Sequence, residues 1–473
     1  MSRAFVIGSG PNGLAAAIVL AGAGLRVEVF EAEDEPGGAT RTLPLTLPGF
    51  LHDFGSAVHP FAAGSPFFAS LPLADFGLEW IHGEAPLAHP LDDGSAVVLE
   101  RDLDETERLL GADGREWRRL VQPAAEHWKE FAEEILAPAL HIPRHPLRMA
   151  RFGLTALESA ENFAKRHFSG PRTRAIFAGL VGHSFLSFDR PLSATIGLMF
   201  GITIHAVGWP IPRGGAQAIP RALIGYLNSL GGVVHISRRI DAEQFCQLKG
   251  ECQLVLFDTS PRQLLAIAGA QMAGYSRKLE RFRPGPGAFK IDYALSHPVP
   301  WRAQECRRAI TVHLGGSFEE IAAAEAEVAR GHCAERPFVL AAQPTFFDPS
   351  RAPQGKHVLW AYCHVPNGST FDMTERIEAQ IERFAPGFRD CVLARYVSTP
   401  AALEAMDANL IGGDISGGAM TLRQMFFRPT WRNYETATPN LYLCSASTPP
   451  GGGVHGMCGY HAARLALRKI GMS

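Results

Sequence analysis

The chain has 473 residues, 46% of them hydrophobic and 19% charged, which is enough apolar material for about three domain-sized units and excludes a disordered, charge-patterned chain. Its 45 basic and 47 acidic side chains leave a net charge of -2, so the overall charge gives no attraction to nucleic acid. The eight cysteines form no CxxC pair and no run reaches the roughly 18 apolar residues of a membrane-spanning helix, so we expect a protein of the reducing cytoplasm.

The chain begins with alternating strand and helix patterns. Apolar residues 4–7 predict a strand, residues 14–23 predict a helix, and residues 26–30 predict a second strand. A glycine-rich turn, residues 8–13, joins the first strand to the helix. A strand–turn–helix–strand unit of this length is typical of a right-handed crossover, and it predicts an α/β domain of Rossmann type.

The turn carries the dinucleotide-binding fingerprint G-x-G-x-x-G at Gly8, Gly10 and Gly13. Glycines here allow a tight turn, close approach of backbone N–H groups to a pyrophosphate, and close helix–strand packing. The helix N-terminus adds oriented N–H groups for that anion. Glu31 ends the second strand, where its carboxylate can accept hydrogen bonds from ribose hydroxyls and disfavours a 2′-phosphate. We predict a dinucleotide site, and the alternative is a structural βαβ unit without a ligand.

The remaining patterns follow in chain order. Residues 34–72 are rich in Gly, Pro and Ser and indicate an ordered loop region, whereas residues 101–170 and 212–227 have helical spacing. Short strands are predicted at residues 233–236, 254–257, 289–295, 338–342 and 357–362. The last unit is a strand at 440–444 followed by a helix over about 456–470.

A second G-x-G-x-x-G pattern, residues 451–456, also lies between a strand and a helix. The sequence after it is too short for another strand with a ribose-binding acid, so we expect it to complete the first site. No other segment offers a nicotinamide site, which disfavours a disulfide reductase built from two Rossmann units.

These motifs resemble the phytoene desaturase-like branch of the FAD-dependent amine oxidase and desaturase flavoproteins. The resemblance rests on residues 8–13, Glu31, Pro36-Gly37-Gly38, Arg41 and residues 450–454. Segments similar to the subgroup related to pyridine nucleotide-disulfide oxidoreductase domain-containing protein 2 lie at 212–215, 258–262, 346–349 and 412–415. The resemblance covers almost the whole chain. It implies FAD, a glutathione reductase-like Rossmann FAD domain and an inserted α+β substrate domain. We expect the FAD to be non-covalent, because neither expected anchor region places a clear cysteine on the flavin ring, with attachment through Cys444 as the alternative.

The expected domains are discontinuous. The FAD domain is assembled from residues 1–75, 212–275 and 415–473. The substrate domain comes from a mainly helical insertion at 76–211 and a mixed-sheet insertion at 276–414.

The resemblance also assigns flavin contacts. Gly37 and Gly38 would let the chain pass beside the flavin, and Arg41 would contact its phosphates or ribityl chain; a surface salt bridge is the alternative for Arg41. The turn at 451–453 would lie against the isoalloxazine, where N–H groups stabilise the negative charge of reduced flavin. The predicted cofactor-binding residues are Gly8, Gly10, Pro11, Asn12, Gly13, Glu31, Gly37, Gly38, Arg41, Ser445, Gly452, Gly453 and Val454.

Two positions depart from the family pattern. Relatives usually have Gly where this chain has Ser445, and His where it has Pro449. Ser445 adds a side chain beside the expected ribityl–pyrophosphate path, so it bears on flavin position and affinity.

Lys290 is the main catalytic candidate. Residues 289–294, followed by Pro300-Trp301-Arg302, are similar to the strand in flavin amine oxidases whose lysine holds a water near flavin N5. A cation there would stabilise negative charge on the flavin and assist reaction with dioxygen. Carotenoid desaturases generally lack this lysine, so it favours oxidase-like chemistry. The alternative is an edge-strand lysine that keeps neighbouring strands apart.

His455 is the second catalytic candidate. Together with Cys458 and His461 it recurs at intervals of three and mimics a metal site, but a fourth ligand is lacking, so we predict no metal. Its position after the second glycine turn places it near the flavin or the pocket mouth by resemblance. A structural histidine is the alternative.

Residues 140–154 mix apolar side chains with five basic ones, His141, Arg144, His145, Arg148 and Arg151. Such a stretch can lie at a membrane surface and admit a lipophilic substrate. Pro143 and Pro146 interrupt its helical regularity, so an ordinary solvated connection is the preferred interpretation and peripheral membrane contact the alternative.

Together, these features predict an FAD-dependent oxidoreductase. It would move hydride between a carbon of an apolar, polyene- or lipid-like substrate and flavin, with dioxygen or a quinone as the second partner. Three alternatives stay open: an amine oxidase that oxidises a C–N bond and releases peroxide, a non-redox FAD-dependent isomerase, and a flavoprotein-derived interaction module. No nucleic-acid partner is expected, and no oligomeric state is predicted.

Overall fold

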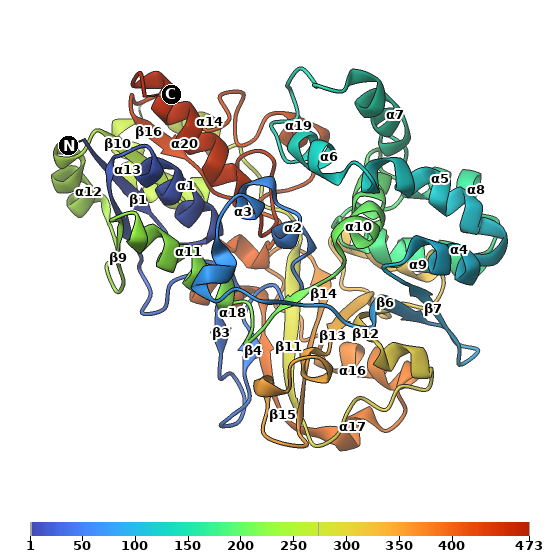
Figure 1. Ribbon diagram of the computed structural model, residues 1–473. Helices are drawn as coiled ribbons and strands as arrows, with labels where there is room; N and C mark the ends of the chain where they lie inside the picture. The colour runs from blue at the N-terminus through green and yellow to red at the C-terminus, as the bar shows by residue number, and fades with distance from the viewer. Residues whose placement is uncertain (1, 273, 473) are drawn as a thin grey trace.

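The chain folds around two β-sheets in a computed structural model that describes residues 2–272 and 274–472 (Figure 1). One sheet has five strands in the order β16-β10-β1-β2-β9, and the other has seven in the order β15-β11-β14-β13-β12-β6-β7. Two short strand pairs accompany them: β3 (Thr42–Leu43) with β4 (His52–Asp53), and β5 (Trp80–Ile81) with β8 (Ile211–Pro212). Within the described ranges, no helix is long and apolar enough to cross a membrane.

The five-stranded sheet is entirely parallel. Its strands are β1 (Arg3–Ile7), β2 (Arg26–Phe30), β9 (Val233–His235), β10 (Leu254–Phe257) and β16 (Leu441–Leu443). Successive side chains of a strand point to opposite faces. Accordingly, Ala4 and Val6 face one buried core while Phe5 and Ile7 face another. The central strand β10 is buried on both faces, which is why it is an unbroken apolar run, whereas β2 nearer the edge alternates Arg26 and Glu28 with apolar residues.

Helices cover both faces of this sheet. The first core includes α1 (Pro11–Gly22), α11 (Ala218–Ser229) and α20 (Met457–Lys469), and the second includes α12 (Ala242–Leu248) and α13 (Pro261–Ala268). Helix α1 begins at Pro11, three residues before the predicted start, because proline tolerates the first helical turn, where its missing N–H is not needed. This doubly wound arrangement confirms the predicted α/β Rossmann class.

The seven-stranded sheet is mostly antiparallel. Its strands are β6 (Ala85–Pro90), β7 (Ala96–Leu99), β11 (Gly287–Leu295), β12 (Ala309–Leu314), β13 (Val339–Ala342), β14 (His357–Val365) and β15 (Val392–Ser398). The pairing of β6 with β12 is parallel, and these two strands are far apart in the chain. Strands β6, β7, β12 and β15 were not predicted from the sequence. The alternative of an edge strand for Lys290 is wrong, because β11 lies between β14 and β15.

The helical insertion packs against one face of this sheet (Figure 1). Its helices are α4 (Leu103–Leu110), α5 (Gly114–Ala125), α6 (Trp128–Ile135), α7 (Pro146–Ala156), α8 (Ala160–His167), α9 (Pro171–Gly182) and α10 (Ser193–Val207). On the same face lies α15 (Phe318–Ala329), and the opposite face is covered by α16 (Thr374–Phe384) and α17 (Phe388–Cys391). The remaining helices are short: α2 (Pro60–Ala63), α3 (Pro66–Ala69), α14 (Ser276–Leu279), α18 (Pro400–Met406) and α19 (Leu422–Phe426).

The strands of each sheet come from the segments that the sequence assigned to it. The five-stranded sheet uses parts of residues 1–75, 212–275 and 415–473, and the seven-stranded sheet uses parts of 76–211 and 276–414. The residue bounds of the two domains stay a prediction.

Candidate cofactor and active site

The strand order of the parallel sheet reverses between β1 and β10. From β1 the chain proceeds outward to β2 and β9, then crosses to β10 and β16 on the other side. Ligands of open α/β sheets bind in the crevice at the carboxyl ends of strands where this order reverses. Two segments meet there: the fingerprint turn after β1 and residues 258–260 after β10.

The fingerprint turn needs its glycines for space as well as for conformation. Gly8 has φ +100°, and a Cβ on it would lie 2.6 Å from the Asp258 backbone oxygen. A Cβ on Gly10 would lie 2.6 Å from Asp258 Oδ2, and one on Gly13 would lie 2.2 Å from the Gly8 oxygen. A side chain at any of the three positions would push the turn away from β10, so the cradle accepts only glycine.

Glu31 is buried at the end of β2 and holds the turn in place. Its Oε2 accepts hydrogen bonds from the backbone N–H of Ser9 at 3.0 Å and from the Ser9 hydroxyl at 2.5 Å. Its Oε1 accepts from the N–H of Glu33 at 3.0 Å. The ribose contact predicted for Glu31 would therefore add to a turn-fixing role that the sequence did not reveal.

Asp258 is a site residue that the sequence analysis did not single out. It follows β10, is buried, and accepts a hydrogen bond on Oδ2 from the N–H of Gly13 at 2.8 Å. Burial raises the pKa of this carboxyl to about 7, and the nearby Asp407 and Glu31 carboxylates act in the same direction. In the sequence, Asp258 could be noticed only as an acidic residue directly after an apolar strand. The order of the strands in the sheet was needed to place it opposite the fingerprint turn.

The Pro36-Gly37-Gly38 loop packs directly on the fingerprint. Gly37 has φ +123°, its N–H donates to the Ser9 hydroxyl at 3.2 Å, and a Cβ there would lie 2.8 Å from Pro220 Cγ. A Cβ on Gly38 would lie 3.5 Å from Gly10 Cα. Both glycines thus let this loop pack closely on the fingerprint turn, and their approach to the flavin stays a prediction.

Arg41 is buried and does not form a surface salt bridge, so that interpretation is wrong. Its Nε donates to the Gly38 carbonyl at 2.9 Å and its Nη2 to the Met406 carbonyl at 2.7 Å. The guanidinium also lies over the Phe54 ring, 5.0 Å from its centre. Arg41 therefore joins the glycine loop to the end of α18, and its contact with phosphate stays a prediction.

The C-terminal glycine turn adopts positive φ angles, which glycine tolerates and which would strain other residues. Gly451 and Gly453 have φ +122° and +130°, and a Cβ on Gly452 would lie 2.6 Å from the Ser416 oxygen. Val454 follows half-buried, and Ser445 is buried with its hydroxyl 2.7 Å from that of Ser447.

His455 is buried at the start of α20. Its Nδ1 accepts from the Met457 N–H at 3.0 Å, and its carbonyl accepts from the Ser65 hydroxyl at 2.6 Å. Burial lowers the pKa of the imidazole to about 4, so the ring is neutral at pH 7. The thiol of Cys458 and the ring of His461 bond to backbone carbonyls instead, and no cluster of metal-binding side chains occurs among the described residues.

Lys290 lies in a buried charged network. Its Nζ pairs with Asp292 on the same face of β11 and lies 5.9 Å from the centre of the Trp360 ring. Asp292 Oδ1 is 3.7 Å from His52 Nδ1. Burial lowers the pKa of Lys290 and raises that of Asp292 to about 6.

The indole of Trp360 links Lys290 to the segment after Arg41. Its Nε1 donates to the Gly55 carbonyl at 2.9 Å, and Phe54 N–H donates to the Arg41 carbonyl at 2.9 Å. In the part of the chain that the structure describes, no hydrogen bond or ion pair joins Lys290 to residues 451–453.

The segments around the crevice carry buried polar atoms that find no partner within the described residues. They are Asn12 Oδ1, Thr259 Oγ1, Ser56 Oγ, both ring nitrogens of His59, and His455 Nε2. Such atoms are rare in a closed core, and a bound polar ligand or an ordered water can supply the missing partner. With the glycine cradle and the N-terminus of α1, they fit a dinucleotide such as FAD, whereas the Asp258 carboxylate opposes its phosphates.

The comparisons with known proteins agree with a Rossmann-like nucleotide-binding fold. Residues 6–69 match the family model of an NAD(P)-binding Rossmann-like domain. The chain is 25% identical to pyridine nucleotide-disulfide oxidoreductase domain-containing protein 2 of Rattus norvegicus over 99% of this chain and 93% of that protein. It is 25% identical to the lycopene-forming phytoene desaturase of Pseudescherichia vulneris over 99% of both chains. A triple mutant of putrescine oxidase has the same fold, with a TM-score of 0.62 and 16% identity over 100% of this chain and 99% of that one.

The chain is similar in sequence to the phytoene desaturases along nearly its whole length. The predicted family resemblance is therefore confirmed, as are the enzyme class, an FAD-dependent oxidoreductase, and FAD as the cofactor. The individual site residues named from the sequence stay predictions, although the structure brings the fingerprint, Glu31, Gly37, Gly38 and Arg41 together.

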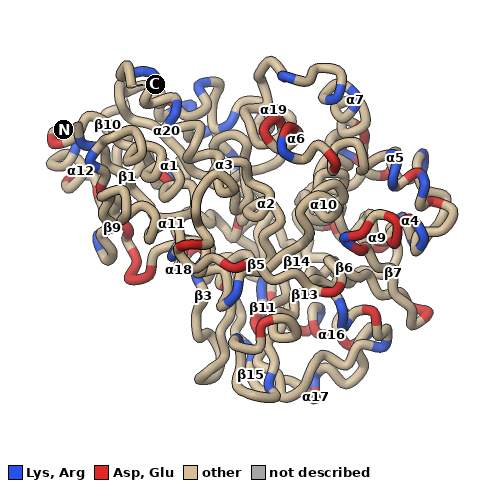
Figure 2. The backbone as a smooth tube through the Cα atoms, viewed as in Figure 1, with Lys and Arg blue, Asp and Glu red and all other residues tan. Residues whose placement is uncertain are grey.

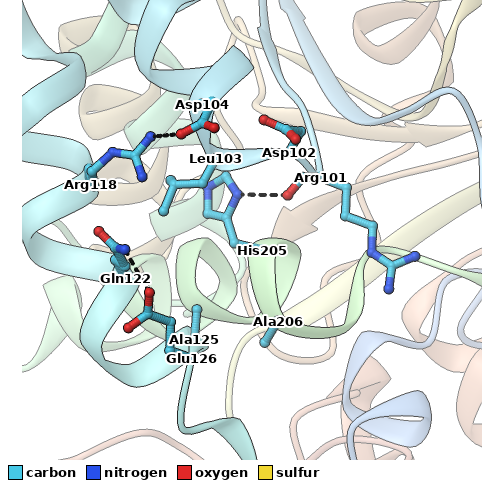
Figure 3. Close-up of a pocket in the computed structure, with 10 residues that line it drawn as sticks. All are labelled: Arg101, Asp102, Leu103, Asp104, Arg118, Gln122, Ala125, Glu126, His205 and Ala206. Carbon is cyan, nitrogen blue, oxygen red and sulfur yellow. Dashed lines mark hydrogen bonds and ion pairs between the residues drawn. The ribbon is translucent and has the colours of Figure 1, made fainter.

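Two clefts lie outside this site. A polar cleft of about 400 Å³ is lined by residues of α4, α5 and α10, including the pair Arg118–Asp104, and none of the predicted site residues line it (Figure 3). A second cleft, of about 130 Å³, lies among α5, α6, α7 and α10 and is lined by Phe131, Met149 and Phe152 together with charged side chains.

Proposed function

We propose that the enzyme holds FAD non-covalently in the crevice between β1 and β10 and removes hydride from a carbon of an apolar substrate, with dioxygen or a quinone as the second partner. When bound, FAD supplies the redox chemistry, and the protein supplies position and electrostatics. The observation that carries the cofactor assignment is the glycine cradle with buried Glu31 at the strand-order reversal.

Each part of the site has a role in this proposal. The N-terminus of α1 and the fingerprint turn would hold the pyrophosphate, and Glu31 the adenosine ribose. The left-handed turn at 451–453 and α20 behind it would face the flavin, because that helix presents its positive end there. Neutral His455 keeps Nε2 available to a ligand without adding charge.

An aromatic path beside Gly453 supports an apolar substrate. A Cβ on Gly453 would lie 3.8 Å from the Phe61 ring, and Phe61 contacts Phe200 at 5.1 Å between ring centres. Phe200 contacts Trp209 at 5.0 Å and His183 at 4.8 Å. Burial lowers the pKa of His183 to about 3, so the path is aromatic and uncharged, which favours a polyene- or lipid-like group over an ammonium.

Anaerobic mixing of the purified enzyme with a substrate panel tests this proposal. We expect unsaturated or isoprenoid-like compounds to bleach the flavin absorbance and amines to leave it unchanged. Bleaching by amines, with peroxide released on admitting air, would favour the C–N oxidase, the second candidate that buried Lys290 supports. If no compound bleaches the flavin, the redox proposal gives way to an isomerase or an interaction module.

We also propose that α7 and the segment before it contact anionic lipid. Four large apolar side chains there are exposed: Leu140 by 60%, Ile142 by 94%, Leu147 by 86% and Leu154 by 73%. Figure 2 marks basic and no acidic positions along α7, where Arg148 and Arg151 lie. Pro146 is the first residue of this helix and does not interrupt it. Its presence therefore no longer argues for a solvated connection over a membrane-surface helix.

A further inference from the structure

The crevice that receives the cofactor already holds an anion of the protein itself. Asp258 Oδ2 accepts a hydrogen bond from the Gly13 N–H at 2.8 Å. This N–H belongs to the first turn of α1, where backbone N–H groups have no partner within the helix. Pro11, the first residue of α1, has no N–H, so this turn offers one backbone donor fewer to a phosphate. A carboxylate at this place makes the contact that a phosphate oxygen would make.

The surroundings of Asp258 provide little compensation for its charge. Glu31 faces it from the end of β2, and partly buried Asp407 faces it from the segment after α18. The thiols of Cys444 on the β16 side and Cys458 on α20 face it as well, and burial raises the pKa of both, so they are neutral. Among the residues described, no Lys, Arg or His forms an ion pair with Asp258.

We infer that Asp258 competes with the cofactor's phosphates for the N-terminus of α1, so that FAD binds tightly when this carboxyl is protonated and weakly when it is ionised. The inference rests on the proposed binding of FAD in this crevice. It makes Asp258 a positioning residue that sets cofactor affinity, and it requires no change in fold.

The sign of the effect follows from the two states. Without FAD, burial already raises the Asp258 pKa to about 7. Phosphate charges close by would raise it further, so binding takes up a proton, and the affinity must fall as pH rises above 7. For one linked proton, Kd rises by up to about tenfold per pH unit in that range.

The test is a titration of the cofactor-free protein with FAD, followed by flavin fluorescence, from pH 6 to 9. We expect the parent to bind about tenfold more weakly at pH 8.5 than at pH 7.5. The variant Asp258→Asn keeps an oxygen for the Gly13 N–H and removes the charge. Its Kd should be independent of pH and, at pH 8.5, at least about tenfold lower than that of the parent.

Asp407→Asn is the matched control, because Asp407 faces the same crevice without bonding to α1. It should keep the pH slope of the parent. A flat titration in the parent, or a slope that Asp407→Asn removes and Asp258→Asn keeps, overturns the inference while FAD binding stands. Failure of the parent and Asp258→Asn to bind FAD at every pH would instead overturn the proposed function.

Thermal unfolding of the cofactor-free protein gives a second readout. Because the folded-state pKa of Asp258 is raised, its contribution to stability is complete below about pH 4 and is lost as pH rises through 7. The melting temperature of Asp258→Asn relative to the parent should therefore increase between pH 5 and pH 8. A constant difference across this range contradicts the inference even if the variant binds no FAD.

Discussion

At the scale of single residues, Lys290 shows how a buried partner changes the consequence of a substitution. Lys290 and Asp292 are both buried and form an ion pair, so the carboxylate compensates the charge of the ammonium. Removing one member of a buried pair leaves the other charge uncompensated. The chemistry proposed for Lys290 therefore cannot be tested by replacing it alone.

We predict that Lys290→Met melts well below the parent at pH 8, with a loss of roughly 3–5 kcal/mol. The double variant Lys290→Met/Asp292→Asn should recover most of this loss, because no isolated carboxylate remains. Differential scanning fluorimetry of the two variants decides this. If the single variant is as stable as the parent, the pair is not a coupled unit.

The double variant also tests the catalytic role proposed for Lys290. If the ammonium stabilises charge on the flavin, reoxidation of the reduced enzyme by dioxygen should slow by about one to three orders of magnitude. The reductive step should change less, because it depends chiefly on substrate position. Stopped-flow measurements of both half-reactions give the answer, and equal, fast reoxidation in parent and double variant would exclude the role.

Glu31 is predicted to contribute to FAD affinity in two ways: by binding the adenosine ribose and by fixing the fingerprint turn through Ser9. Glu31→Ala should weaken FAD binding tenfold or more, because each charge-assisted hydrogen bond contributes about 1.5–3 kcal/mol. Glu33→Ala, at a partly exposed neighbouring position, serves as the control. Isothermal titration with FAD measures both, and equal affinity for the two variants would remove the assignment.

At the scale of elements, the contact between α1 and α20 depends on Gly459, which lies outside both glycine motifs. A Cβ on Gly459 would lie 1.8 Å from the Asn12 carbonyl oxygen, so the two helices touch through backbone. This contact joins the fingerprint helix to the helix behind the C-terminal turn, and it sets the distance between the two halves of the cofactor site.

Gly459→Ala should therefore separate the helices and lower both stability and FAD affinity, whereas Gly22→Ala should not. Gly22 ends α1 with nothing within 4 Å of its Cβ position, and replacing a helical glycine by alanine stabilises by about 0.5–1 kcal/mol. Thermal melts and FAD titrations of the pair provide the comparison. Equal effects of the two substitutions would contradict the contact.

Helix α7 is expected to carry part of the proposed lipid contact. Leu147→Glu and Leu154→Glu should reduce co-sedimentation with vesicles of phosphatidylcholine and phosphatidylserine, because burial of each leucine contributes about 1.5–3 kcal/mol. Both side chains are exposed, so the melting temperature should not change. Binding that is unaffected by either substitution, or that persists equally on neutral vesicles at high salt, contradicts the proposal.

At the scale of the whole molecule, the described part of the parallel sheet contains one complete dinucleotide fingerprint, followed by Glu31 at the end of β2. The second glycine turn closes the same sheet through β16 and α20. We predict that NADH and NADPH do not reduce the flavin at a useful rate. Stopped-flow reduction that saturates at micromolar nucleotide would show that a nicotinamide site exists.

The sequence by itself determined the nucleotide-binding half of this protein. Strands β2 and β10 were predicted at their observed bounds, because β10 is an apolar run buried on both faces and β2 alternates between polar and apolar residues. Strands β6, β7, β12 and β15 were missed, since their register in a mixed sheet depends on partners far along the chain.

Only the tertiary structure decided which groups share a site. Lys290 and Asp292 are two residues apart in any strand, yet their burial against Trp360 follows from β11 being a central strand. Asp258 lies 245 residues from Gly13 in the chain, and no local pattern relates them. The crossover that places β10 beside β1 brings this carboxylate to the N-terminus of α1, because parallel strands align their carboxyl ends at one edge of the sheet.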